Sequence, residues 1–257
     1  MTQRKLLTPV LGITLAASLF LTPVAGPAQG WGHNPGNDDQ QTDLGTVITD
    51  LPVQELSSEE EAGLIKMREE EKLARDVYTT LYQQWSSQVF ENIAGSEQQH
   101  MDTIKVVLDK YGLVDPVTDE SEVGVFTDSH LQELYDSLVA QGQQSLIDAL
   151  TVGATIEDLD IYDLNELIAE TDNEDIQVAY GNLVKGSRNH LRTYTSQLSD
   201  NGVTYEAQFL TQEEVDEIIG SPMERGNVTG TPGTEDSEDE NRQIATILIS
   251  CRYLLTR

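Results

Sequence analysis

The chain has 257 residues, in which 45 Asp and Glu outnumber 15 Lys and Arg and give a formal net charge of −30. This charge argues against a nucleic-acid-binding protein, because a phosphate backbone would be repelled. The single cysteine, Cys251, excludes a disulfide within one chain. Charged residues at 23% and apolar residues at 38% are typical of soluble proteins. Beyond the N-terminal segment, no stretch approaches the roughly 20 apolar residues of a membrane span.

The first 28 residues have the three-part pattern of a secretory signal peptide. Arg4 and Lys5 precede an uncharged stretch from Leu6 to Val24, and the small residues that follow end at Ala28. We expect cleavage after Ala28, and the alternative is an uncleaved N-terminal anchor. Either way, the sequence predicts an exported protein that is periplasmic, envelope-associated or extracellular, with no membrane span once the signal is removed.

Composition divides the remainder into three parts. Residues 29–56 are rich in Gly, Pro and Asp without a sustained apolar period, which predicts a flexible linker. Residues 57–225 carry the helical patterns described below and are expected to form one domain. Residues 226–257 begin with Gly, Thr and acids, which predicts an acidic, disordered tail.

Two long helices are predicted first, over residues 57–85 and 90–111. The earlier one opens with the capping sequence Ser-Ser-Glu-Glu-Glu, and both have apolar residues at alternating spacings of three and four, which place them on one face. Glu71 falls on this face in the first helix, and Glu97 and His100 fall on it in the second. Acidic and imidazole side chains are therefore expected inside the domain.

The connection to the third long helix is unusual in its length. It takes the 31 residues from Gly112 to Gly142, whereas neighbouring helices of a bundle are usually joined by about 2 to 8 residues. Such a length predicts a crossover connection rather than a hairpin. Within it, residues 130–140 are expected to form a short helix.

Two further long helices are predicted over residues 146–167 and from near Asn173 to Leu198. The same spacing places Glu157 and Asp160 on the inner face of the former and His190 on that of the latter. The predicted fold is therefore all-α, a four-helix bundle whose second and third helices are joined by a long crossover with a short helix.

Buried acids on three helices, with histidines on two, point to a metal site. An isolated ionised carboxylate is costly inside a bundle, and buried charges persist where they are paired or bind a metal. Oxygen and imidazole ligands suit iron or manganese, and zinc usually takes fewer ligands. A pair of ions bridged by carboxylates is one known solution in four-helix bundles. A buried polar network, or an error in the assumed helical phase, is the alternative.

Four segments carry these residues in order: Glu71–Tyr78 (EKLARDVY), Ser96–Met101 (SEQQHM), Gly153–Ile161 (GATIEDLDI) and Gly186–Arg192 (GSRNHLR). Together they resemble the ferritin-like superfamily and, more narrowly, the uncharacterised DUF2202 family. The resemblance covers roughly residues 56–225. It implies a ferritin-like four-helix bundle, with rubrerythrin-like proteins as the functional model, and it implies as metal ligands Glu71, Glu97, His100, Glu157 and His190.

One position departs from the superfamily pattern. Ser187 stands where the resemblance implies a glutamate on the fourth helix, and Asp160, one turn after Glu157, is expected to supply the replacement carboxylate. No Cys-x-x-Cys pair of the rubredoxin type is present. Peroxidase turnover would therefore need a reductant from outside the chain.

These observations predict an exported di-iron or di-manganese carboxylate protein. Two ions, iron first with manganese or zinc as alternatives, would lie between the bridging carboxylates Glu71 and Glu157, and the partner would be a small oxidant such as peroxide or dioxygen. As an enzyme it would be an oxidoreductase of the ferroxidase or peroxidase type. The alternative is a non-enzymatic metal-binding or structural bundle of the cell envelope. The sequence leaves a homodimer open and gives no basis for a cage.

Overall fold

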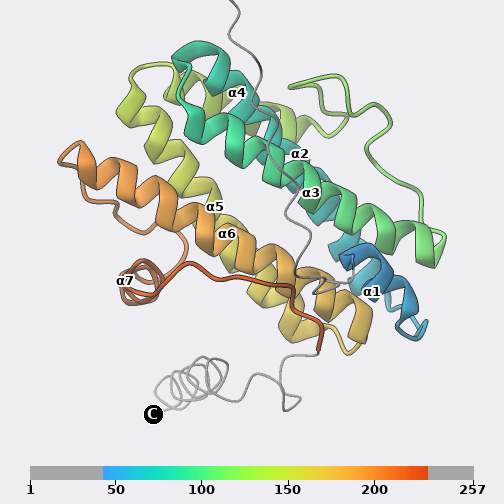
Figure 1. The fold of residues 1–257 in the computed structure, drawn as a ribbon. Coiled ribbons are helices and arrows are strands. Elements are labelled where there is room, and N and C mark those ends of the chain that lie inside the picture. Colours follow the sequence, from blue (N-terminus) through green and yellow to red (C-terminus); the bar gives the residue numbers. More distant parts are fainter. Residues whose placement is uncertain (1–42, 231–257) are drawn as a thin grey trace, which may run out of the picture. The chain divides into compact units, whose positions relative to one another are not determined.

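The structure is a computed structural model that describes residues 43–230 (Figure 1). Within this range it contains seven α-helices and no strand, which confirms the all-helical prediction: α1 Leu44–Asp50, α2 Ser58–Trp85, α3 Gln88–Tyr111, α4 Ser129–Gly142, α5 Leu146–Glu170, α6 Glu174–Asp200 and α7 Gln212–Gly220. The predicted signal peptide, the start of the predicted linker, Cys251 and most of the predicted tail lie outside the described residues. The predicted domain limits stay predictions.

The helices α2 and α3 form a hairpin at the position that the sequence predicts. Ser57 caps α2 in a capping box, in which its side chain accepts from the backbone N–H of Glu60 while the Glu60 carboxylate accepts from that of Ser57. The helix ends at Ser86, which adopts a left-handed conformation with φ of 51° and donates its N–H to the carbonyl of Tyr82. This tight turn returns the chain as α3, so the two helices pack along their length (Figure 1).

The helices α5 and α6 form a second hairpin. Ser145 caps α5, and residues 171–173 turn the chain into α6. Besides the contacts within each hairpin, α3 packs against α6 and α2 packs against α5. The four long helices thus enclose one core of aliphatic side chains, Tyr78, Tyr180 and Tyr194, an arrangement consistent with the predicted bundle. Among the described helices, none is both long and apolar enough to cross a membrane.

The predicted crossover contains the predicted short helix, α4, which packs against α2 and α5. Residues 113–128 precede α4 and are held by cations on the outer face of α2. Lys72 donates to the carbonyls of Glu122 and Val125, and both Lys72 and Arg75 pair with the fully buried Asp76. The crossover is therefore attached to α2 by buried charged groups.

Part of the predicted linker is helical in the structure. Asp43 caps α1 by accepting from the backbone N–H of Thr46, and Ile48 is fully buried. Lys110 of α3 donates to the carbonyls of Ile48 and Leu51, which lie at the end of α1. A seven-residue helix is too short to show an apolar period, so these tertiary contacts explain why the sequence pattern did not reveal it.

A buried carboxylate holds the segment after α6 in place. Asp158 of α5 is fully buried and accepts from the hydroxyl of Tyr205 and from the backbone N–H groups of Gln208, Phe209 and Leu210. The chain then forms α7, which packs against α6. Residues 224–228 continue along α6 as well, since Glu224 pairs with two arginines there and Val228 exchanges two hydrogen bonds with Asn182. The first residues of the predicted tail are thus attached to α6.

Replacing Asp158 by Ala should lower the free energy of unfolding by about 2 to 4 kcal/mol, because buried donors that lose their acceptor each cost about 1 to 3 kcal/mol. Glu166→Ala is the matched control, since Glu166 lies on the same helix but is exposed. Chemical denaturation of the purified variants measures both values. Equal unfolding midpoints for the two variants would contradict the role assigned to Asp158.

Candidate metal centre

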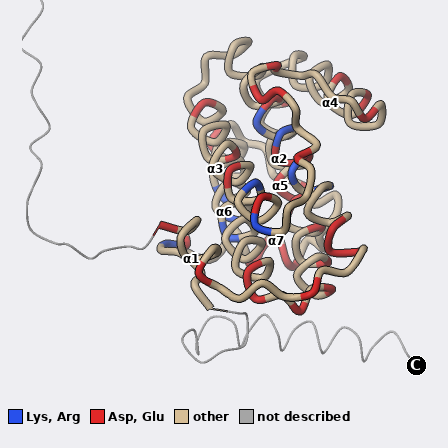
Figure 2. The backbone as a smooth tube through the Cα atoms, turned by 90° about the vertical axis from the view of Figure 1, so that its right-hand side faces the viewer, with Lys and Arg blue, Asp and Glu red and all other residues tan. Residues whose placement is uncertain are grey.

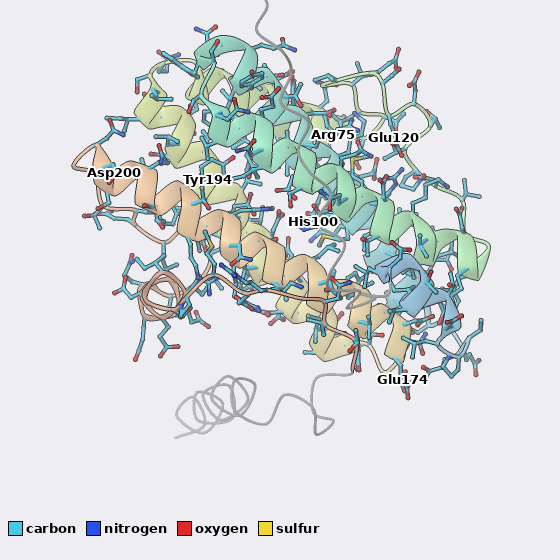
Figure 3. The ribbon with its side chains drawn as sticks, viewed as in Figure 1. Arg75, His100, Glu120, Glu174, Tyr194 and Asp200 are labelled. Atoms are coloured by element: carbon cyan, nitrogen blue, oxygen red, sulfur yellow. The ribbon has the colours of Figure 1, made fainter. Side chains whose placement is uncertain are left out.

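All six predicted ligands lie inside the four long helices. Their side chains come from α2, α3, α5 and α6, and each is buried: Glu71, Glu97 and Glu157 are 0% exposed, Asp160 is 4% exposed, and His100 and His190 are each 8% exposed. The spacing of three and four residues therefore predicted the inward direction of all six correctly. His100, labelled in Figure 3, lies where α3 faces α6.

Five of the six residues form two overlapping groups. Glu71, Glu97 and His100 make one group, and Glu97, Glu157 and His190 make the other, with the ligand atoms of each group within 4.8 Å of one another. Glu97 is common to both. Two cation positions would therefore be adjacent, with the Glu97 carboxylate between them.

Two histidines face the Glu97 carboxylate, His100 from the same helix, α3, and His190 from α6. The Nδ1 atom of His100 lies 2.7 Å from one oxygen of Glu97, and the Nδ1 atom of His190 lies 2.9 Å from the other. His100 Nδ1 is also 3.1 Å from Glu71, and His190 Nδ1 is 3.3 Å from Glu157. The imidazole rings stack at 5.5 Å between centroids. Both rings thus turn the same nitrogen toward the centre of the site.

Several oxygens at the centre lack a hydrogen bond among the described residues. These are both oxygens of Glu97, Oε1 of Glu71 and Oδ2 of Asp160, and all are inaccessible to solvent. The histidine nitrogens are near enough to Glu97 for an ion pair but do not have the direction of a hydrogen bond. Buried carboxylate oxygens without a donor are unfavourable unless a cation binds them. The residues present therefore fit a metal ion.

The ionisation of the cluster reflects burial and mutual attraction. Burial raises the pKa of Glu71 to about 8 and that of Glu157 to about 7, although the neighbouring histidines oppose this. Burial lowers the pKa of His190, but attraction to the carboxylates of Glu97 and Glu157 exceeds this effect and raises the pKa to about 10. For Glu97 the balance is reversed, because attraction to His190 and His100 exceeds the effect of burial and lowers its pKa.

Asp160 lies near the cluster but belongs to neither group. Burial and repulsion from Glu71, Glu157 and Glu97 raise its pKa well above the usual range. Ser187, where the resemblance implies a glutamate, is fully buried, and its hydroxyl donates to the carbonyl of Leu183. The replacement of that glutamate by Asp160 stays a prediction.

The carboxylate common to both candidate groups is not one of the two that were expected to bridge. Glu71 and Glu157 were expected to bridge, yet each belongs to only one group, whereas Glu97 belongs to both. The reason is that Glu97 lies between two histidines, one on its own helix and one on α6. Its position there depends on how α3 packs against α6, which helical periodicity does not determine.

Two side chains that hold the candidate ligands were not predicted in that role. Tyr78, a fully buried residue of α2, donates its hydroxyl to Glu157 at 2.6 Å. Ser96, which carried no apolar signal, lies 2.9 Å through its hydroxyl from Nε2 of His190. Such partners fix the orientation of a ligand and the nitrogen that it presents.

A glycine on α6 makes room for one of the histidines. A Cβ atom at Gly186 would lie 2.3 Å from Nε2 of His100 and 2.6 Å from its Cε1. No side chain fits at that distance, so the ring of His100 occupies the space that the glycine leaves. Gly186 belonged to one of the four sequence segments, but its role depends on the packing of α3 against α6.

Comparisons with known proteins agree on one family. The model of an uncharacterised protein domain, DUF2202, matches residues 60–222. The chain is 56% identical over 179 residues to the uncharacterised protein MJ0754 of Methanocaldococcus jannaschii, which covers 70% of this chain and 96% of that relative. A crystal structure of the hypothetical protein MJ0754 from the same organism is similar with a TM-score of 0.66 and 55% identity, over 68% of this chain and 99% of the other. The chain therefore belongs to the DUF2202 family.

Proposed function

We propose that this protein binds a pair of metal ions between its four long helices, in the manner of ferritin-like proteins, and uses them in redox chemistry. The observation that supports this most is the pair of adjacent ligand groups that share Glu97, whose oxygens are buried without a hydrogen bond. Oxygen and imidazole donors favour iron, with manganese or zinc as alternatives.

The ligands divide between the two ions by their grouping. One ion would take Glu71, Glu97 and His100, and the other would take Glu97, Glu157 and His190. Asp160 is proposed as a further carboxylate ligand of the pair, because it is buried close enough to Glu71, Glu157 and Glu97 to be repelled by all three. In this assignment Asp160 supplies the acid that the superfamily pattern would place at Ser187.

The protein side chains prepare the site in three ways. The Ser96 hydroxyl can accept the Nε2–H of His190, which leaves the Nδ1 lone pair directed at the centre. The Tyr78 hydroxyl orients Glu157, and the surrounding apolar core keeps bulk water away. Bound iron or manganese would supply the exchange of electrons with ferrous iron, peroxide or dioxygen. Because the chain has a single cysteine, the reductant for such turnover would come from another molecule.

Metal stoichiometry tests the shared role of Glu97. The wild-type protein should bind two ions per chain, Glu71→Gln and Glu157→Gln should each retain about one, and Glu97→Gln should lose both, because it belongs to both groups. Elemental analysis after anaerobic loading with ferrous iron measures this.

The control for that series is Glu91→Gln, which changes an exposed acid near the start of α3 and should still bind two ions. If the wild-type protein is folded and retains no metal after loading, or if Glu97→Gln retains both ions, the proposed site is wrong. When metal is retained, adding ferrous iron with peroxide or dioxygen separates the two functions. Rapid oxidation supports the oxidoreductase, and metal retention without oxidation supports the non-enzymatic alternative.

A matched pair of glycine substitutions tests the position of His100. Gly186→Ala should weaken metal binding by roughly tenfold, because the added Cβ meets the ring, and losses of this size follow when the residues that orient a ligand change. Gly95→Ala on α3 adds the same methyl group where nothing lies within 4 Å and should leave affinity unchanged. Competition with a coloured chelator measures both, and equal affinities would contradict the packing argument.

We also propose that the protein is exported, on the basis of its first 28 residues. Protein purified from its native cells should then begin at Gln29, because the signal would be removed after Ala28. Intact mass measurement and N-terminal sequencing check this. A chain that starts at Met1 and fractionates with the cytoplasm would exclude export.

A further inference from the structure

The six candidate ligands are not equally shielded from solvent. The three glutamates are 0% exposed and Asp160 is 4% exposed, whereas His100 and His190 each keep 8% of their surface exposed. The two histidines stack on each other where α3 faces α6. A molecule that approaches the cluster from outside therefore meets an imidazole before it meets a carboxylate.

A surface depression lies over this edge of the cluster. It has a volume of about 440 Å³, opens to solvent, and is lined from α3 and α6 by Val89, Asn92, Ile93, His190, Thr193 and Gln197. His190 is the one member of this lining that also belongs to a candidate ligand group. The depression therefore reaches from solvent to the side chain of His190, a member of the second candidate ligand group.

The side chains of the lining favour some classes of small molecule over others. The lining contains no Asp or Glu, so a cation would find no partner of opposite charge, and its one ionisable side chain, His190, already faces the carboxylates of Glu97 and Glu157. The net charge of −30 further repels anions. A small uncharged molecule that leaves water can form hydrogen bonds instead with the amide and hydroxyl groups of Asn92, Thr193 and Gln197. The volume would hold many waters at about 30 Å³ each, so the space suits passage rather than a tight fit.

We propose that this depression is the port through which a small uncharged oxidant, of the size of dioxygen or hydrogen peroxide, reaches the acid–histidine cluster at His190. What happens to the oxidant at the cluster rests on the proposed function. The port itself is a property of the polypeptide. It can be tested in the metal-free protein, so its failure can be told apart from failure of the metal site.

The first experiment uses dissolved dioxygen as an uncharged paramagnetic probe of the metal-free protein. Methyl relaxation under oxygen pressure should be enhanced severalfold more at Ile93 than at Ile161, although the two residues are almost equally buried, at 5% and 2% exposure. Ile93 lines the depression and Ile161 does not. Equal enhancement at both methyl groups would overturn the port.

The second experiment narrows the depression from either wall. Thr193→Trp on α6 and Asn92→Trp on α3 should each slow the association of nitric oxide with the ferrous-loaded protein severalfold, as measured by stopped-flow absorbance. Ser196→Trp adds the same side chain at an exposed position of α6 outside the lining and should leave the rate unchanged. Circular dichroism and metal content identify any variant that is misfolded, and the variant from the other wall then decides.

Unchanged rates in both port variants, with two ions still bound, would show that the oxidant enters elsewhere. Slower association in those variants but not in Ser196→Trp would support the port. If the wild-type protein binds no metal, the proposed function fails, and the relaxation measurement alone decides whether dioxygen reaches the cluster through this depression.

Discussion

The attraction between the Glu97 carboxylate and two histidines is the interaction on which the interior of this protein depends. Glu97 is fully buried, and each of its oxygens lies within 3 Å of a histidine nitrogen. The histidine pKa values are raised and that of Glu97 is lowered, so protonated imidazoles can balance the carboxylate when no metal is bound. Glu71 and Glu157, with raised pKa values, can share the remaining protons. Protonated imidazoles therefore offset part of the cost of burying Glu97 in the metal-free bundle, and metal binding would exchange these protons for a metal ion.

The helices that carry the cluster are held from outside by a second set of buried charges. The outer face of α2 bears Lys72, Arg75 and Asp76, which attach the crossover, while its inner face bears Glu71. Asp158, which follows Glu157 in the sequence, attaches the segment after α6 to α5. Figure 2 shows how few basic residues there are beside the many acids along the tube. Several of these basic residues hold connecting segments rather than facing solvent, which explains how so acidic a chain keeps its long connections ordered.

The sequence predicted the four long helices and the inward direction of all six candidate ligands, because alternating spacings of three and four residues follow directly from the helical repeat. Periodicity does not, however, predict how the helices pack against one another. Which carboxylate is common to both candidate groups depends on how α3 packs against α6, and the need for glycine at Gly186 depends on the close approach of the His100 ring. The Glu70 side chain lies off the inner stripe of α2, yet it is only 14% exposed and pairs with Lys66, which also pairs with Asp163. These are tertiary facts, and no single helix encodes them.

The departure at Ser187 connects the chemistry of the site to its access. The superfamily pattern implied by the resemblance would put a carboxylate on α6, the helix that carries His190. Here α6 offers a serine whose hydroxyl is engaged with its own backbone, and the additional acid, Asp160, stands on α5 among Glu71 and Glu157. The acids are thereby gathered on α2, α3 and α5, and α6 contributes only an imidazole to the cluster. The depression between α3 and α6 consequently reaches His190 with no Asp, Glu, Lys or Arg in its lining. An uncharged molecule then loses little hydration on entering, whereas an ion finds no Asp, Glu, Lys or Arg in the lining to offset the hydration that it loses.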